Sequence, residues 1–147
     1  MPEHAATLRT TVAARLRREN QRFTTKRSVL VDVLADAPGP LTIPEILDVR
    51  PELAQSSVYR NLLVLEQAGV VHRILTNGEF ARYELAEDLT EHHHHLICAS
   101  CGAVEDVPAS AGLEAAVHQV VEEVRRQAGF RTHQHRVDLV GRCRRCS

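Results

Sequence analysis

The chain has 147 residues and a formal net charge of −1, and its 44% hydrophobic and 25% charged residues are ordinary for a globular protein. No apolar run approaches the roughly 20 residues of a membrane span, and the first residues lack the apolar segment of a signal peptide. A cytoplasmic location is therefore expected. Because aromatic residues make up only 3% of the chain, any core must be aliphatic.

The charge is unevenly distributed along the chain. Residues 1–27 hold seven Lys and Arg residues against two acids, whereas acids exceed bases from Gly78 onward. A basic front end suits a phosphate backbone, and an acidic, histidine-rich back end suits cations. Either cluster alone would also fit a solvated surface.

The first part of the chain predicts three helices. Apolar residues recur at helical spacing over residues 5–18, and Thr24 or Thr25 can cap a second helix that ends at the turn Pro38-Gly39-Pro40. Thr42-Ile-Pro-Glu45 is a capping box, in which hydroxyl and carboxylate each satisfy a free backbone N–H. It opens a short third helix.

A fourth helix and a β-hairpin follow. Ser56 or Ser57 is expected to cap a helix that runs through Ala68, and Gly69 suits its left-handed end. VVHRIL and FARYEL are β-rich runs separated by an Asn-Gly pair, which is a strong hairpin signal. Helices followed by a hairpin are the order of a winged helix. In its helix-turn-helix motif, the second helix lies in the major groove of DNA and reads the bases. The sequence thus predicts an N-terminal winged-helix DNA-binding domain over residues 1–85, the alternative being a small helical bundle with a hairpin.

The rest of the chain predicts a second, mixed α/β domain, which gives an α+β fold overall. Residues 86–91 (AEDLTE) form the expected hinge, and residues 92–147 the expected metal-binding domain. Its expected elements are a strand that begins at Leu96-Ile97, a short hairpin strand over residues 104–107, a helix over residues 113–127 and a closing strand within HQHRVDLVGRC.

Two Cys-x-x-Cys pairs carry the strongest chemical signal in the sequence. Cys98 and Cys101 form one pair, and Cys143 and Cys146 the other. In a reducing cytoplasm such pairs indicate zinc before disulfides, and four thiolates close a tetrahedral structural site. A redox dithiol would need only one pair and a thioredoxin-like setting. We therefore predict a structural Zn²⁺ that ties the closing strand to the first cysteine turn.

The histidine run EHHHHLICASCG precedes the first cysteine pair. In an extended segment side chains alternate between faces, so His92 and His94 point one way and His93 and His95 the other. One run can then supply two ligands to each of two metal sites, whereas a solvated loop is the alternative. His72 and Glu84 on the wing are candidate partners for His93 and His95. The candidates to join His92 and His94 are Glu114, His118 and His135. Sites of nitrogen and oxygen ligands suit Fe(II), Zn(II), Mn(II) and similar ions.

With these motifs together, the chain resembles the ferric uptake regulator family of metal-dependent bacterial repressors. The motifs that carry the resemblance are RFTTKR, SSVYRNLLVLEQAG, the wing ending ARYEL, HHHHLICASCG and the segment from His135 to Cys146. The resemblance implies a winged helix, a C-terminal α/β dimerisation domain and a homodimer that grips palindromic double-stranded operator DNA when its sensor metal is bound.

Site residues follow from the matching motifs. The resemblance implies that Arg22, Tyr59 and Arg60 contact DNA, and Ser57 lies on the same predicted recognition helix. It implies the following metal ligands: Cys98, Cys101, Cys143 and Cys146 for structural zinc; Glu84, His93 and His95, with His72 on the wing, for a sensor site; and His92, His94, Glu114 and His135 for a second regulatory site, with His118 as an alternative to Glu114.

The chain also departs from the family pattern. Pro40 stands where iron-sensing members commonly bring a histidine, whereas His72 matches a wing position used by zinc-sensing members, so the sensor metal is expected to be Fe(II) or Zn(II), with Mn(II) as an alternative. Asp106, which the family motif places near the sensor site, keeps a peroxide-sensing branch open. A metal-storage or trafficking protein without DNA binding is a further alternative, and the absence of an HExxH motif argues against a zinc hydrolase.

Overall fold

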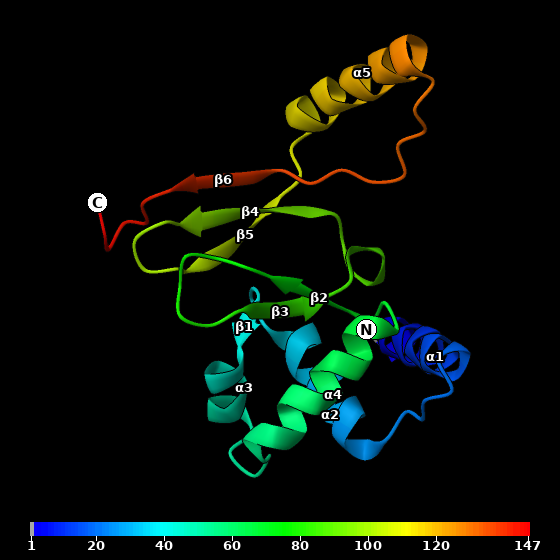
Figure 1. The fold of residues 1–147 in the computed structure, drawn as a ribbon, viewed down its shortest axis with the longest axis vertical. Helices are drawn as coiled ribbons and strands as arrows, with labels where there is room; N and C mark the ends of the chain where they lie inside the picture. The colour runs from blue at the N-terminus through cyan, green and yellow to red at the C-terminus, as the bar shows by residue number, and fades with distance from the viewer. Residues whose placement is uncertain (1) are drawn as a thin grey trace.

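The computed structural model describes residues 2–147, which form an α+β architecture with two three-stranded sheets. The N-terminal elements are α1 (Pro2–Arg18), α2 (Thr25–Asp36), β1 (Leu41–Thr42), α3 (Ile43–Val49), α4 (Gln55–Gln67), β2 (Val71–Ile74) and β3 (Arg82–Leu85). The C-terminal elements are the 3-10 helix η1 (Glu87–Leu89), β4 (His93–Cys98), β5 (Val104–Pro108), α5 (Ala111–Ala128) and β6 (Asp138–Gly141). Figure 1 shows the C-terminal sheet lying over the wing strands β2 and β3.

The N-terminal elements share one aliphatic core. Leu16, Leu62 and Leu65 are fully buried, and Tyr83 and Leu85 of β3 enter the same cluster. The antiparallel sheet has the order β1-β3-β2. Helices followed by a wing are the predicted order, so the α+β class and the winged helix are confirmed.

The helix caps agree with the sequence prediction in two cases out of three. The Thr24 and Thr42 side chains accept hydrogen bonds from the backbone N–H groups of Arg27 and Glu45, as capping residues do. The predicted serine cap of α4 is wrong, because α4 begins at Gln55 after an Ala54 cap that makes no side-chain hydrogen bond.

The wing is a hairpin with a longer loop than an Asn-Gly turn requires. Its register places His72 opposite Glu84 and Ile74 opposite Arg82, and residues 75–81 form the loop. The predicted hairpin is therefore confirmed, but the Asn-Gly pair lies inside the loop and is not itself the turn between the strands.

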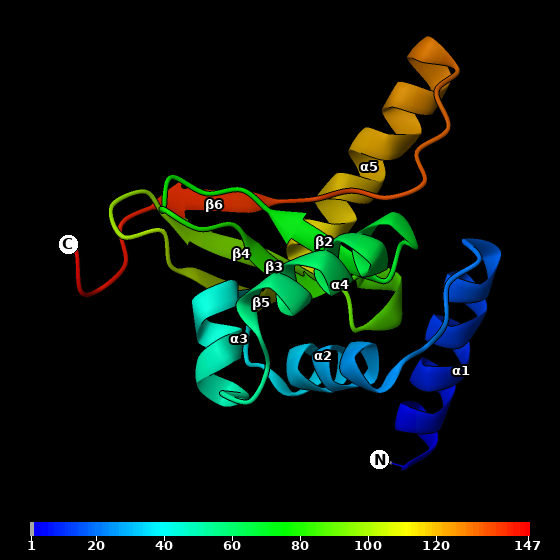
Figure 2. The same cartoon turned by 60° about the horizontal axis from the view of Figure 1, so that its bottom comes forward.

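The C-terminal sheet has the order β5-β4-β6, with β4 antiparallel to β5 and parallel to β6. Ser110 caps α5 and left-handed Gly129 ends it. None of the residues of α5 is buried, and Figure 2 shows this helix extending away from the sheet. Across residues 2–147, no helix is both long and apolar enough to span a membrane.

Candidate metal centres and DNA-binding surface

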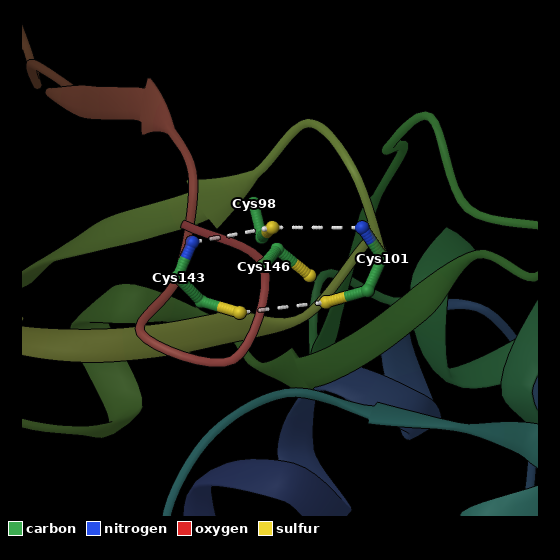
Figure 3. Close-up of side chains that lie close together, drawn as sticks. All are labelled: Cys98, Cys101, Cys143 and Cys146. Atoms are coloured by element: carbon green, nitrogen blue, oxygen red, sulfur yellow. Dashed lines mark hydrogen bonds between the residues drawn. The ribbon is translucent and has the colours of Figure 1, made fainter.

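The four cysteines converge where β4 ends and β6 ends. Parallel pairing brings Cys98 opposite Gly141, so the turn after β4 and the chain after β6 meet. Figure 3 shows the Cys98 sulfur accepting the N–H groups of Cys101 and Cys143, at 3.5 and 3.3 Å, and the sulfurs of Cys101 and Cys143 lie 3.8 Å apart. All four cysteines are free thiols.

This geometry fits zinc. In a regular tetrahedron with Zn–S bonds of about 2.3 Å, the sulfurs are about 3.8 Å apart. The backbone N–H groups of Cys101 and then of Cys143 lower the pKa of the Cys98 thiol to about 6, which favours the thiolate that a metal needs. The four cysteines would thus hold a closed structural site.

A second cluster, called here the hinge cluster, consists of Glu84, His93, His95 and Asp106. The Nε2 atoms of His93 and His95 each lie 3.0 Å from a Glu84 carboxylate oxygen. Asp106 enters from β5, with its Oδ1 atom 3.8 Å from His93 Nε2 and 3.7 Å from His95 Nε2. The cluster joins a wing strand to the C-terminal sheet.

The Nδ1 atoms of the two histidines in the hinge cluster make contacts that orient the rings. Nδ1 of His93 lies 2.9 Å from the Glu91 carbonyl oxygen, and Nδ1 of His95 lies 3.3 Å from a carboxylate oxygen of Asp138. Such contacts fix the ring so that the other nitrogen faces the ligand position. Asp138 is a residue that the sequence did not single out, since only the β4–β6 register brings it beside His95.

A third cluster, the second-site cluster, consists of His92, His94, Glu114 and His135. The Glu114 carboxylate lies 2.5 Å from His94 Nε2 and 2.8 Å from His135 Nε2. Nε2 of His92 and Nε2 of His135 are 3.0 Å apart, and Glu87 of the hinge contacts the other nitrogen of His92. The structure includes Glu114 in this group and leaves the exposed His118 outside it.

With this geometry, the comparisons with known proteins are informative. The model of the ferric uptake regulator family matches residues 18–140. The chain belongs to this family. It is 35% identical over 98 residues to the ferric uptake regulation protein of Bacillus subtilis, a match that covers 66% of this chain and 62% of that protein. The chain thus matches less than two thirds of the length of that relative.

Two further relatives match most of the chain. The structure of the Helicobacter pylori ferric uptake regulator, described as having three functional metal-binding sites, has a TM-score of 0.74 and 25% identity, and covers 97% of this chain and 93% of its own. The peroxide operon regulator of Bacillus subtilis is 27% identical over 136 residues, covering 90% of this chain and 88% of that protein. The family therefore includes both iron and peroxide regulators similar to this chain.

His72 differs from the sequence expectation. It lies opposite Glu84 in the wing ladder, but the hinge cluster contains Asp106 in its place. Its Nε2 atom is buried and has no hydrogen-bond partner among residues 2–147, and the side chain lines a cavity of about 830 Å³ that Glu84 and His95 also line. Burial first, and then the charge of Arg136, lower the pKa of His72. His72 thus lies beside the hinge cluster without being grouped with it, and its role as a metal ligand stays a prediction.

The side chains proposed to contact DNA are exposed on the winged helix. Tyr59 is 58% exposed, and Arg60 and Arg22 are also exposed. The Arg27 side chain donates to the Arg22 carbonyl and to the Asn61 side chain, and it thereby ties the start of α2 to α4. A shallow notch lies between these helices and is lined by Thr24, Thr25, Lys26, Arg27, Ser57, Arg60 and Asn61. Sequence reasoning missed the Arg27–Asn61 link because it depends on how α2 packs against α4.

The hinge cluster predicts the pH dependence of metal binding. Burial opposes protonation of His93 and His95, but other contacts outweigh it and raise the pKa of both rings. For His93 these are hydrogen bonds to the Glu91 carbonyl and to Glu84, and for His95 they are hydrogen bonds to Glu84 and Asp138. Burial likewise opposes ionisation of Glu84, yet its histidine contacts lower the pKa. In the metal-free protein these contacts stabilise the fold above the usual glutamate pKa and below the usual histidine pKa. This contribution is lost as pH rises through the raised histidine pKa values.

Metal binding has the opposite pH dependence, because both protons must leave. We expect the Mn(II) concentration that half-fills the hinge cluster to rise about tenfold per displaced proton for each pH unit below the histidine pKa values. Titrations at pH 6, 7 and 8, followed by the EPR signal of free Mn(II), measure this. Half-filling that is independent of pH would contradict the histidine ligands.

Proposed function

We propose that this chain is a metal-dependent transcriptional repressor that acts as a homodimer on palindromic operator DNA in the cytoplasm, and not as an enzyme. The observation that carries the proposal is the composition of the hinge cluster. Glu84 comes from the wing, whereas His93, His95 and Asp106 come from the C-terminal sheet. A divalent ion held by these residues would bridge the DNA-reading half and the rest of the protein.

The bridge would act by shifting a population. Without it, the two halves retain freedom that must be lost when two recognition helices engage adjacent half-sites. Closing the bridge removes that cost in advance, so occupancy of the hinge cluster and DNA binding strengthen each other. The donor set lacks thiolate and suits Fe(II) or Zn(II), with Mn(II) as an alternative.

The C-terminal half supports the homodimer. Exposed apolar side chains lie on β6 and α5, including Leu139 at 60% exposure, Val140 at 66% and Val120 at 57%. β6 is an edge strand of its sheet, with one side open to pairing. A second copy would cover these residues and bring two winged helices together.

Operator binding tests the proposal. The probe is a fluorescein-labelled palindromic duplex that the purified protein selects from a random library, measured by anisotropy in EDTA and in buffered Fe(II), Zn(II) or Mn(II). We expect tight binding only with metal, and the most effective ion identifies the sensor metal. Binding that is unchanged by chelation contradicts the repressor mechanism. Metal uptake without binding to any duplex would indicate storage or trafficking instead.

Peroxide sensing is the second candidate, and the presence of Asp106 in the hinge cluster favours it. Hydrogen peroxide added to the Fe(II)-loaded protein would then release the operator and add oxygen to His93 or His95, which mass spectrometry detects. Release without modification of either histidine excludes this branch.

Arg60 provides a test of the DNA surface. We expect Arg60→Ala to weaken operator binding about 10- to 100-fold and to relax base preference, as the loss of a base-reading arginine does. Lys26→Ala is the matched control, because an exposed lysine in the same notch is placed for a phosphate contact. Lys26→Ala should weaken binding to all duplexes by a similar factor. It should also reduce the slope of log binding constant against log salt concentration by about one. Equal specificity profiles for the two variants would contradict base reading by Arg60.

A further inference from the structure

Arg82 occupies the same face of β3 as Glu84. Side chains two residues apart on a strand point the same way, whereas Tyr83 and Leu85 between and beyond them enter the N-terminal core. One face of a four-residue strand is therefore directed at the C-terminal half. Glu84 reaches the hinge cluster from this face, and Arg82 reaches the cysteine turn.

The Arg82 side chain is 14% exposed and makes contacts in both halves of the molecule. Its Nε donates to the Gly102 carbonyl at 3.0 Å, directly after Cys101. Its Nη1 donates to the Pro40 carbonyl at 3.2 Å and to the Glu45 carboxylate at 3.0 Å. The planar guanidinium thus links the turn before β1, helix α3 and the cysteine turn in one arrangement.

Backbones of the two halves also meet at this place. A Cβ added to Gly102 would lie 2.8 Å from the Cα of Gly78 in the wing loop and 3.0 Å from its nitrogen. A Cβ on Gly39 would lie 3.4 Å from the Val104 carbonyl of β5. The wing loop and the turn before β1 therefore rest directly against the cysteine turn and β5.

We infer that Arg82 is a positioning residue. Its contacts with Gly102, Pro40 and Glu45, called here the clasp, hold the winged helix against the cysteine turn and so set how readily the hinge cluster closes. This inference rests on the proposed metal-dependent function. The clasp and the hinge cluster lie on the same interface between the halves, and the clasp holds Glu84 near His93 and His95. The structural zinc site thereby acquires a second role, as the fixed surface against which the DNA-reading half docks.

Loss of the clasp lowers the docked population and leaves the ligands intact. A ligand that binds only the docked state then needs a higher concentration, and saturation restores docking. We expect Arg82→Ala to raise the Mn(II) concentration for half-filling of the hinge cluster about tenfold, and to raise that for half-maximal operator binding by the same factor. Saturating Mn(II) should restore wild-type operator affinity. Damage confined to the winged helix would instead weaken operator binding at every metal concentration.

The experiment uses the full chain with zinc-loaded cysteines and follows Mn(II) binding by EPR. Arg73→Ala is the matched control, because Arg73 lies on the neighbouring strand and, among the residues that the structure describes, pairs only with Glu66 of α4. The second-site cluster, which lies wholly in the C-terminal half, is the internal control. If Arg82→Ala and Arg73→Ala give the same Mn(II) isotherm, or if both metal clusters weaken together, the inference is overturned. Mn(II) binding needs no DNA, so this result stands even where the wild-type protein fails to bind the operator.

Gly102→Ala tests the backbone approach separately. Its Cβ would force the wing loop away, whereas Gly129→Ala introduces the same left-handed strain with nothing within 4 Å. We expect Gly102→Ala to shift the hinge isotherm in the direction of Arg82→Ala with zinc content unchanged, and Gly129→Ala to leave it unshifted. Retained zinc with an unshifted isotherm in Gly102→Ala contradicts the clasp. If Gly102→Ala loses zinc, the Arg82→Ala and Arg73→Ala comparison decides.

Discussion

Replacing Cys143 with serine is expected to remove the zinc and unfold the C-terminal half while the winged helix remains folded. The two halves differ in what holds them. The N-terminal half has an aliphatic core that includes fully buried Val12, Leu16 and Leu62. In the C-terminal half, by contrast, all residues of β6 are exposed and none of α5 is buried. A small unit without a sufficient apolar core needs a further stabilising element, such as a structural metal ion.

The expected effect is large. Structural zinc contributes about 10–16 kcal/mol of apparent folding free energy at neutral pH, which equals or exceeds the total stability of a typical domain. Circular dichroism should therefore show loss of the C-terminal transition and retention of the N-terminal helices. Ser100→Ala is the control, since it alters the same turn without removing a thiolate. A Cys143→Ser protein that melts like the wild type without bound zinc would refute the structural role.

His93→Ala is expected to abolish metal-dependent operator binding, whereas His92→Ala should only weaken it. The two residues are adjacent and the chemical change is the same, but their side chains enter different clusters. Nε2 of His93 lies 3.0 Å from Glu84 on the wing, while Nε2 of His92 lies 3.2 Å from Glu114 on α5. Only the first contact crosses from the C-terminal sheet to the DNA-reading half.

Losing one ligand of the hinge cluster removes the bridge itself. We expect the Mn(II) requirement for operator binding to rise more than 100-fold in His93→Ala, near the upper end of typical coupling energies. His92→Ala should leave the metal response in place with a shift of about tenfold or less. Anisotropy titrations of both variants over buffered Mn(II) measure the difference. Equal losses would indicate a single shared site and would contradict the two-face arrangement.

Much of the fold could be predicted because its signals are local. The Thr24 and Thr42 caps, the wing and left-handed Gly69 depend on a few neighbouring residues, and all are confirmed. The start of α4 could not be predicted from its serines. Ser57 lies within the helix, where its carbonyl and hydroxyl accept hydrogen bonds from the Asn61 side chain.

Strand alternation in the sequence predicts which histidines share a face, but it does not predict which residues of other strands join them. Alternation assigns His93 and His95 to one face, and the structure groups them with Glu84 accordingly, although metal binding at these residues stays a prediction. The family motif placed Asp106 near this site, but its contact with the two histidines depends on the pairing of β4 with β5, which sets Asp106 opposite His95. No local pattern contains that register. For the same reason the sequence favoured His72, whose position opposite Glu84 is a property of the wing alone.

Reciprocal titration tests the central claim that metal and operator act through one docked state. The operator dissociation constant is measured with and without saturating Mn(II), and the Mn(II) dissociation constant of the hinge cluster with and without saturating operator duplex. The account predicts that both are strengthened by the same factor, about tenfold or more, because coupling between two sites is reciprocal. An operator affinity that Mn(II) leaves unchanged, while Mn(II) fills the hinge cluster, would contradict it.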